Sequence, residues 1–206
     1  SLRGAFTLSD TEPQPRFEPL QAPDATLRLN DGKITAQAGL VSPKRQLTVG
    51  SVTLAHDLTR GEGHALLDIP GIRFQTEGLQ PNELTALTYG VIADVDGLVA
   101  GSGRFDWSGE TVTSTGRFTA TEISLAAVFG QVQGLTTRLE FADLLNMRTA
   151  PGQSATMAEI NPGVPVRDGA LRYRLLDARR VEVEGGRWPF AGRSEEHTSE
   201  LQSRVD

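Results

Sequence analysis

Hydrophobic and polar residues alternate along most of the chain, most regularly in residues 161–192. Every second residue of two segments there is apolar: Leu171, Tyr173, Leu175, Val181 and Val183. The residues between them are arginines in the first segment and glutamates in the second. Because a period of two is typical of half-buried β-strands, we predict a hairpin with one apolar and one charged face. Residues 167–169 and 178–180 are predicted to be turns, and Gly185-Gly186 a bulge.

The same alternation recurs upstream between turn signals. Residues 25–40 are predicted to form a hairpin around Asn30-Asp31-Gly32, and longer strands are predicted at 93–107, 111–118 and 134–141. The alternation changes phase at Gly50-Ser51, which predicts a β-bulge. Segments 144–150 and 154–160 are expected to pair with each other. Two segments favour a short helix: 81–88, which starts with proline, and 123–130.

These elements predict a mainly all-β protein: a long, curved antiparallel β-sheet that forms a groove, with one or two short helices. A β-sandwich would need a second set of apolar faces to cover the first. The apolar positions in this chain are just sufficient to line one face. We therefore expect a single sheet whose concave face is apolar.

Composition narrows the possible functions. The formal net charge of the 206 residues is −6 at pH 7, whereas a nucleic-acid-binding surface needs a basic stripe, so we expect no nucleic-acid partner. The sequence has no cysteine, which excludes disulfides and thiolate metal sites within it. It also has no run of about 18 apolar residues that would predict a membrane-spanning helix.

Three segments differ in character. Residues 1–24 are interrupted by prolines and are predicted to be an extended segment or the edge of a preceding part. Their start has neither an initiator methionine nor a signal sequence, so we expect a longer protein. Residues 25–192 carry the alternation. Residues 193–206 begin with RSEEHTSELQS, which resembles the in-frame translation of a common short-read sequencing adapter, and we interpret them as an artefact tail.

The histidines are the first candidates for a reactive site. His56 and His64 flank a predicted turn and could face each other across a hairpin, with Glu62 nearby. Because no third ligand is spaced to complete a tetrahedral metal site, ordinary strand histidines are favoured.

Other reactive groups are equally unsupported by their surroundings. Asp94, Asp96 and Asp106 could be paired carboxylates, but solvated strand charges are favoured. No serine lies in a G-x-S-x-G turn, and Gly101-x-Gly103 leads into a strand rather than a helix. We therefore expect no catalytic residues, no metal, no cofactor and no enzymatic activity.

Several sequence strings resemble the YdbH-like family. They are NPGVPV (161–166), Asp168-Gly169, residues 171–176, VEGGRWPF (183–190), LDIPG (67–71), residues 103–118 and FADLL (141–145). The resemblance covers most of residues 25–192, and its strings are structural rather than catalytic. It implies a relative of the AsmA/TamB group, which are inner-membrane-anchored periplasmic proteins with a long β-groove implicated in phospholipid transport between the inner and outer membranes.

The resemblance implies phospholipid acyl chains as cargo, a periplasmic location and an N-terminal inner-membrane anchor outside this sequence. A small outer-membrane or periplasmic protein is a further expected partner. The family has also carried an older label, dicarboxylate transport domain. This sequence does not support dicarboxylate chemistry, because no convergent pair of arginines can be placed in it. We expect the following residues to line the lipid groove: Val99, Phe105, Trp107, Val112, Phe118, Leu135, Leu139, Phe141, Leu171, Tyr173, Val181 and Val183.

The alternative is a structural or adaptor module of the cell envelope, with no lipid cargo. In that case a partner, or the segments near Leu84 and Leu125, would cover the apolar face. A continuous uncovered apolar strip would favour lipid, and a closed strip would favour an ordinary core.

Overall fold

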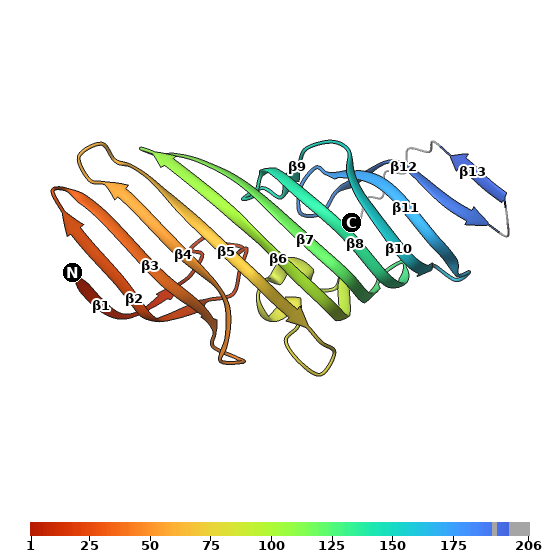
Figure 1. The fold of residues 1–206 in the computed structure, drawn as a ribbon, viewed down its shortest axis with the longest axis horizontal. Coiled ribbons are helices and arrows are strands. Elements are labelled where there is room, and N and C mark those ends of the chain that lie inside the picture. The colour runs from red at the N-terminus through yellow and green to blue at the C-terminus, as the bar shows by residue number, and fades with distance from the viewer. Residues whose placement is uncertain (191–192, 198–206) are drawn as a thin grey trace.

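The computed structural model describes residues 1–190 and 193–197, with side chains as far as Trp188. Its strands form one antiparallel sheet in which β1 to β8 and then β10 to β13 are neighbours in chain order (Figure 1). The short β9 pairs only with β8 along this path. The strands of the described residues are β1 (Leu2–Leu8), β2 (Leu20–Asn30), β3 (Lys33–Ser42), β4 (Leu47–Asp57), β5 (Glu62–Phe74), β6 (Ile92–Ser108), β7 (Thr111–Ala127), β8 (Gly130–Asp143), β9 (Arg148–Thr149), β10 (Gln153–Asn161), β11 (Val166–Leu175), β12 (Val181–Phe190) and β13 (Arg193–His197).

This architecture confirms the predicted long antiparallel sheet, and its turns follow from local sequence. Asp31 and Gly32 join β2 to β3 with φ of 46° and 73°. Positive φ at both central residues matches the right-handed twist of the flanking strands, so this two-residue loop closes a hairpin without splaying it. The predicted bulge near Gly50 is also present. Leu40 pairs with Gly50 and Val41 with Thr48, which leaves one extra residue on β4.

One predicted turn is wrong. Residues 167–169 lie inside β11, and the chain reverses earlier, at 162–165. Asp168 has a φ of 54°, so the aspartate, rather than the glycine that suggested a turn, adopts the left-handed conformation. In this position that conformation bends a strand that stays paired with β10 and β12. The predicted turn at 178–180 lies between β11 and β12, as expected.

Two further predictions near the middle of the chain are corrected by strand pairing. Residues 123–127 form the end of β7 rather than a helix, because Ile123 and Leu125 pair with Leu135 and Val132 of β8. Residues 154–160 lie in β10, which pairs with β8 and β11, and not with 144–150. The segment 81–88 contains two 3₁₀ turns, η1 (Pro81–Glu83) and η2 (Ala86–Thr88), in place of a single helix.

A line of left-handed residues crosses the sheet. Asp94 of β6, Glu122 of β7, Gly134 of β8 and Asp168 of β11 all have φ between 51° and 64°. The register of β6–β7 and of β7–β8 shifts close to these residues. Because an irregularity of this kind bends its strand and increases the twist, residues so aligned curve the sheet.

The last strand belongs to the segment that we interpret from its sequence as a tail. Arg193–His197 forms β13, which pairs with β12, and residues 198–206 lie outside the described residues. A sheet edge pairs through backbone groups of any sequence. The interpretation of 193–206 as an artefact therefore stays a prediction. No helix among the described residues is long and apolar enough to cross a membrane.

Candidate functional site

The strand register places all twelve predicted lining residues on the same face of the sheet. In an antiparallel pair, directly opposed residues share a face, and so do residues two apart on one strand. Trp107 pairs with Val112 across β6 and β7. Phe118 pairs with Gly101 and with Leu139, which carries the face onto β8. The face continues onto β10 and β11 because Thr137 pairs with Ala155 and Ala155 with Leu171. It reaches β12 where Tyr173 pairs with Val183.

The twelve residues differ in how far they are covered. Phe141 and Tyr173 are only 6% and 8% exposed, whereas Val112 is 52% and Val181 41% exposed. The other eight are half-buried, and of these Val99 and Leu135 pack against the buried cluster of the sheet. The face is thus neither a closed core nor a bare surface.

The same face extends beyond the predicted set. Leu54 pairs with Ala65 and Ala65 with Phe105, which joins β4 and β5 to the face. The further apolar residues that the register adds include Leu27, Leu29, Ile34, Ala36, Ala38, Val52, Leu54, Leu67, Ile69, Ala155 and Met157. Their alternation is visible in the sequence, but only the register shows that it is in phase with that of β6 to β12.

The opposite face is polar and carries ion pairs within and between strands. Arg104 contacts Asp106 at 2.6 Å, and Arg117 contacts Glu140 at 3.4 Å. The hydrogen bond from Arg104 holds the pKa of the Asp106 carboxyl below its usual range. Such exposed pairs add little stability, but they show that this side of the sheet is solvated.

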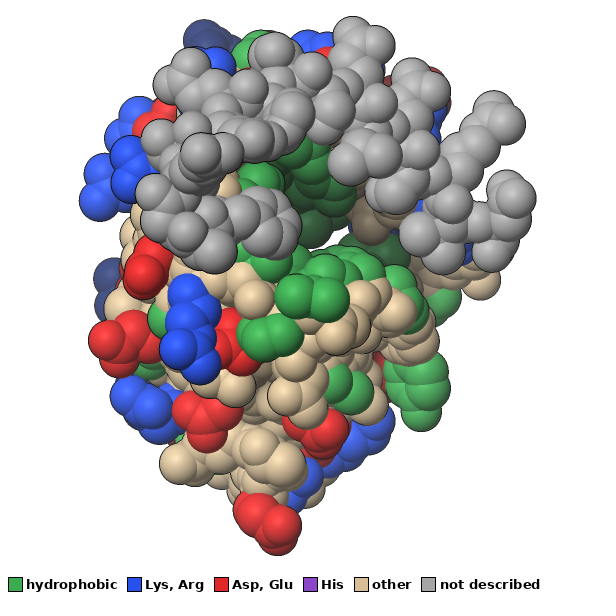
Figure 2. Space-filling model, turned by 90° about the vertical axis from the view of Figure 1, so that its right-hand side faces the viewer, with side chains coloured by type: hydrophobic (Ala, Val, Ile, Leu, Met, Phe, Trp, Pro, Cys, Tyr) green, Lys and Arg blue, Asp and Glu red, His purple; other side chains and the backbone are tan. Residues whose placement is uncertain are grey.

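Figure 2 looks along the long axis of the molecule from the end that carries β12 and β13. Hydrophobic side chains gather around a hollow near the centre of this view, and charged side chains lie on the outer surface. The apolar face of the register is therefore the inner, concave one. We call it the apolar trough: the inward face of β2 to β12 that contains the twelve predicted residues.

Aromatic rings cover glycines across the strands of the trough. A Cβ at Gly63 would overlap the Trp107 ring, and one at Gly101 would overlap the Phe118 ring. The Phe118 ring also meets the Phe141 ring edge-on, with centroids 5.8 Å apart. Each glycine therefore provides the space in which a neighbouring aromatic ring lies flat against the sheet.

A single side chain enters the trough from the turn after β8. Leu144 lies over Gly103 and Gly116, where a Cβ at either position would be 2.8 Å and 3.1 Å from its Cδ2. The turn is held because the Leu145 N–H donates to the Ser114 hydroxyl at 2.9 Å. Leu144 thus occupies a part of the trough that the strands leave empty.

One margin of the trough is covered by the segment between β5 and β6. Leu79 is buried in the main cluster, and Leu84 packs against it. The Gln80 side chain anchors this segment, since it donates to the Val95 carbonyl at 2.8 Å and accepts from the Val95 N–H at 2.9 Å. The Glu18 N–H donates to the Leu84 carbonyl at 2.8 Å, which ties the loop before β2 to the same cover. The trough is therefore closed along this margin.

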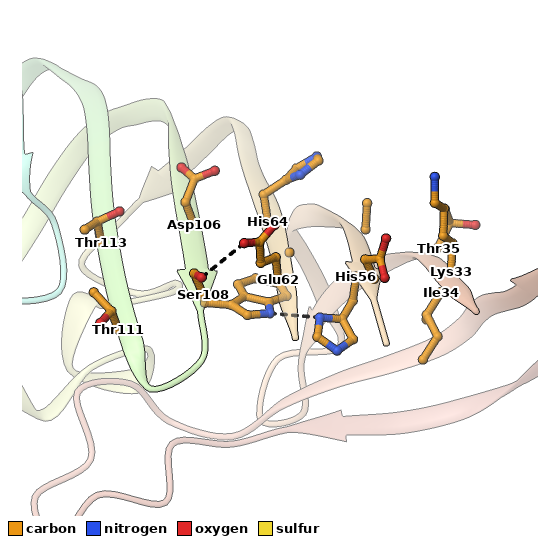
Figure 3. Close-up of a pocket in the computed structure, with 14 residues that line it drawn as sticks. Lys33, Ile34, Thr35, His56, Glu62, His64, Asp106, Ser108, Thr111 and Thr113 are labelled. Carbon is orange, nitrogen blue, oxygen red and sulfur yellow. Dashed lines mark hydrogen bonds between the residues drawn. The ribbon is translucent and has the colours of Figure 1, made fainter. Parts of the chain in front are cut away.

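The two histidines do not face each other. His56 pairs with Gly63, and His64 pairs with Ala55, so their side chains lie on opposite faces. Figure 3 shows this arrangement beside a shallow depression of about 610 Å³, where His56 Nδ1 accepts a hydrogen bond from Trp107 Nε1 at 3.0 Å. No group of three metal-ligating side chains occurs among the described residues.

The carboxylates are not paired with each other either. Asp106 is bound to Arg104, and Asp94 and Asp96 are exposed at the far end of β6. The register of β6 shifts between Ala93 and Asp96. These residues are solvated strand charges in the structure.

A protein-family profile for the YdbH-like family, described as "Intermembrane phospholipid transport protein YdbH", matches residues 2–192. No curated protein matches the chain, and no solved structure matches it.

Proposed function

The chain belongs to the YdbH-like family, and we propose that it is a non-enzymatic segment of a conduit that carries phospholipid between the inner and outer membranes. The observation that supports this proposal most strongly is the apolar trough. It crosses ten neighbouring strands, from β2 to β12 with β9 off the path, while the opposite face carries charges. Acyl chains would lie on the trough, and head groups would remain in water.

The trough has the properties that transfer requires. Each acyl methylene that leaves water for an apolar surface gains about 0.8 kcal/mol, so even partial burial holds a chain. The contacts are spread over half-buried side chains of similar character, such as Phe105, Phe118 and Leu139. Uniform contacts leave no single deep minimum, so a lipid can shift along the trough in small steps.

The location and partners follow from the same proposal. The family description names transport between membranes, which supports a periplasmic location. The proposal also includes an N-terminal inner-membrane anchor and a small outer-membrane or periplasmic partner protein.

Matched charge insertions test this function. Phe118→Asp places a carboxylate in the trough, and Thr115→Asp places the same group three residues away on the outer face of β7, opposite Arg104. The full chain would be produced with a secretion signal and studied by native mass spectrometry with lipid extraction. We expect phospholipid to co-purify with the unchanged protein and with Thr115→Asp, and to be lost from folded Phe118→Asp. Equal lipid on all three proteins would refute the assignment.

The second candidate is a structural or adaptor module without cargo. It is favoured by the cover that Leu79 and Leu84 form over one margin and by Leu144 inside the trough. On that account the unchanged protein would be folded and free of lipid in the same experiment.

A further inference from the structure

Three neighbouring turns at one edge of the sheet carry exposed apolar side chains. They are the segment before β6, the turn between β7 and β8, and the turn between β10 and β11, all at the lower edge of the sheet in Figure 1. Their exposed fractions include 74% for Tyr89, 69% for Val128, 66% for Val164 and 55% for Phe129. The complete set, which we call the apolar rim, is Leu87, Tyr89, Val91, Val128, Phe129 and Val164.

The turns of the apolar rim are adjacent in space. Ile92 pairs with Ala127, so the segment before β6 lies beside the β7–β8 turn. A Cβ at Gly130 would overlap the carbonyl of Asn161, so the β7–β8 turn touches the β10–β11 turn. The exposed side chains thus follow one continuous edge.

The tips of these turns carry no charged residue, and the nearest charges along the chain are Asp94, Glu122, Glu159 and Arg167 on the adjoining strands. No aspartate, glutamate, lysine or arginine occurs in residues 86–93, 123–137 or 160–166. The turns at the other ends of the same strands are different, because they carry Arg60, Glu110, Arg179 and Arg180. Solvent-exposed turns normally hold polar residues, so an uncharged apolar edge needs an apolar environment.

We propose that the apolar rim docks into the interfacial layer of a phospholipid bilayer. The proposal goes beyond the conduit function, since it concerns a surface outside the trough. Tyr89 and Phe129 are the aromatic types that suit this layer, because an aromatic body enters the acyl boundary while a phenol hydroxyl stays in the head-group region. The rim would place the ends of β6, β7, β8, β10 and β11 at the bilayer.

A protein partner fits this surface less well. A stable protein interface uses about 20–30 residues on each side, and the apolar rim offers six side chains on separate turn tips. Insertion of separate tips into a bilayer needs no such continuous area.

Flotation of the full chain with neutral phosphatidylcholine vesicles tests the proposal. We expect binding that is unaffected by salt, because no charge takes part. The double variant Phe129→Ser/Val164→Ser should weaken it at least tenfold. The matched control is Leu58→Ser, which removes an apolar side chain of 53% exposure from the β4–β5 turn at the opposite edge and should bind normally.

The position of the contact is tested with Phe129→Trp in vesicles that contain brominated lipid. We expect bromine to quench the fluorescence that this tryptophan adds to that of the unchanged protein. No binding, equal binding by the double variant, or an unquenched tryptophan would overturn the proposal. A dimer in sedimentation velocity that the double variant abolishes, without vesicle binding, would identify a second copy as the occupant.

Failure of this proposal is distinguishable from failure of the conduit function. Phe118→Asp lies in the trough and should leave vesicle flotation unchanged while it loses extracted lipid. The rim variant should lose flotation while it keeps whatever lipid the trough carries.

Discussion

Two glycines of β6 that face the trough should respond differently to a single methyl group. A Cβ at Gly101 would overlap the Phe118 ring and lie 2.5 Å from the backbone oxygen of Arg117. A Cβ at Gly103 would meet the Leu144 Cδ2 at 2.8 Å, and its next neighbour would be 3.5 Å away. Backbone and a stacked ring yield less easily than the end of a leucine side chain.

The magnitudes follow from this difference. Overpacking typically costs about 1–3 kcal/mol, and a displaced Phe118 also loses part of its edge contact with Phe141, worth about 0.5–1.5 kcal/mol. Glycine-to-alanine replacement returns about 0.4–1 kcal/mol by restricting the unfolded chain. We therefore expect Gly101→Ala to lower the free energy of unfolding by about 2 kcal/mol. For Gly103→Ala we expect a change within about 0.5 kcal/mol, because its small overlap and the entropic gain nearly cancel.

Urea unfolding followed by circular dichroism measures both values, with an unchanged dependence on urea concentration as the control. The double variant Gly103→Ala/Leu144→Ala separates the Leu144 contact from the backbone effect. An equal loss of stability in the two single variants would refute the register that places Phe118 over Gly101.

Three further predictions concern stability. Hydrogen bonds from Arg16 hold the pKa of the Asp10 carboxyl well below its usual range. The contribution of this carboxylate to the free energy of unfolding is therefore complete above the pKa of the unfolded chain, about 3.9, and declines as the pH falls below that value. Thermal melts of Asp10→Asn and the unchanged protein should differ at pH 6 and converge in acid. Glu122, at a φ of 51°, should tolerate glycine, whereas valine should cost about 2 kcal/mol in urea unfolding. Burial raises the pKa of the Tyr173 hydroxyl, which is 2.7 Å from the Thr137 hydroxyl. Tyr173→Phe should cost about 1 kcal/mol, and absorbance titration should show that this tyrosine ionises last.

The sequence was sufficient to predict the sheet and its apolar face because both depend on a period of two. Leu171 and Tyr173 lie on one face of any strand that contains them, whatever the neighbouring strands are. The same period of two places Val112 and Phe118 on one face of β7, and the register confirms that placement. Whether these side chains contact lipid remains a proposal.

Other features depend on contacts that a local pattern does not contain. Asp168-Gly169 has the residue types of a turn, and only the pairing of Gly169 with Met157 of β10 makes it a bend within a strand. Residues 123–127 suit a helix or a strand, and the pairing with β8 decides. The cover formed by Leu79 and Leu84 depends on the path of a loop across the sheet.

Photo-crosslinking at adjacent positions tests the central claim most directly. Benzoylphenylalanine would replace Leu139 and Leu171 on the trough and Arg138 and Arg172 on the outer face, in the full chain exported to the periplasm. We expect phospholipid adducts at 139 and 171 and none at 138 and 172. Adducts that do not alternate between the faces, or no adduct on the folded protein, would contradict it.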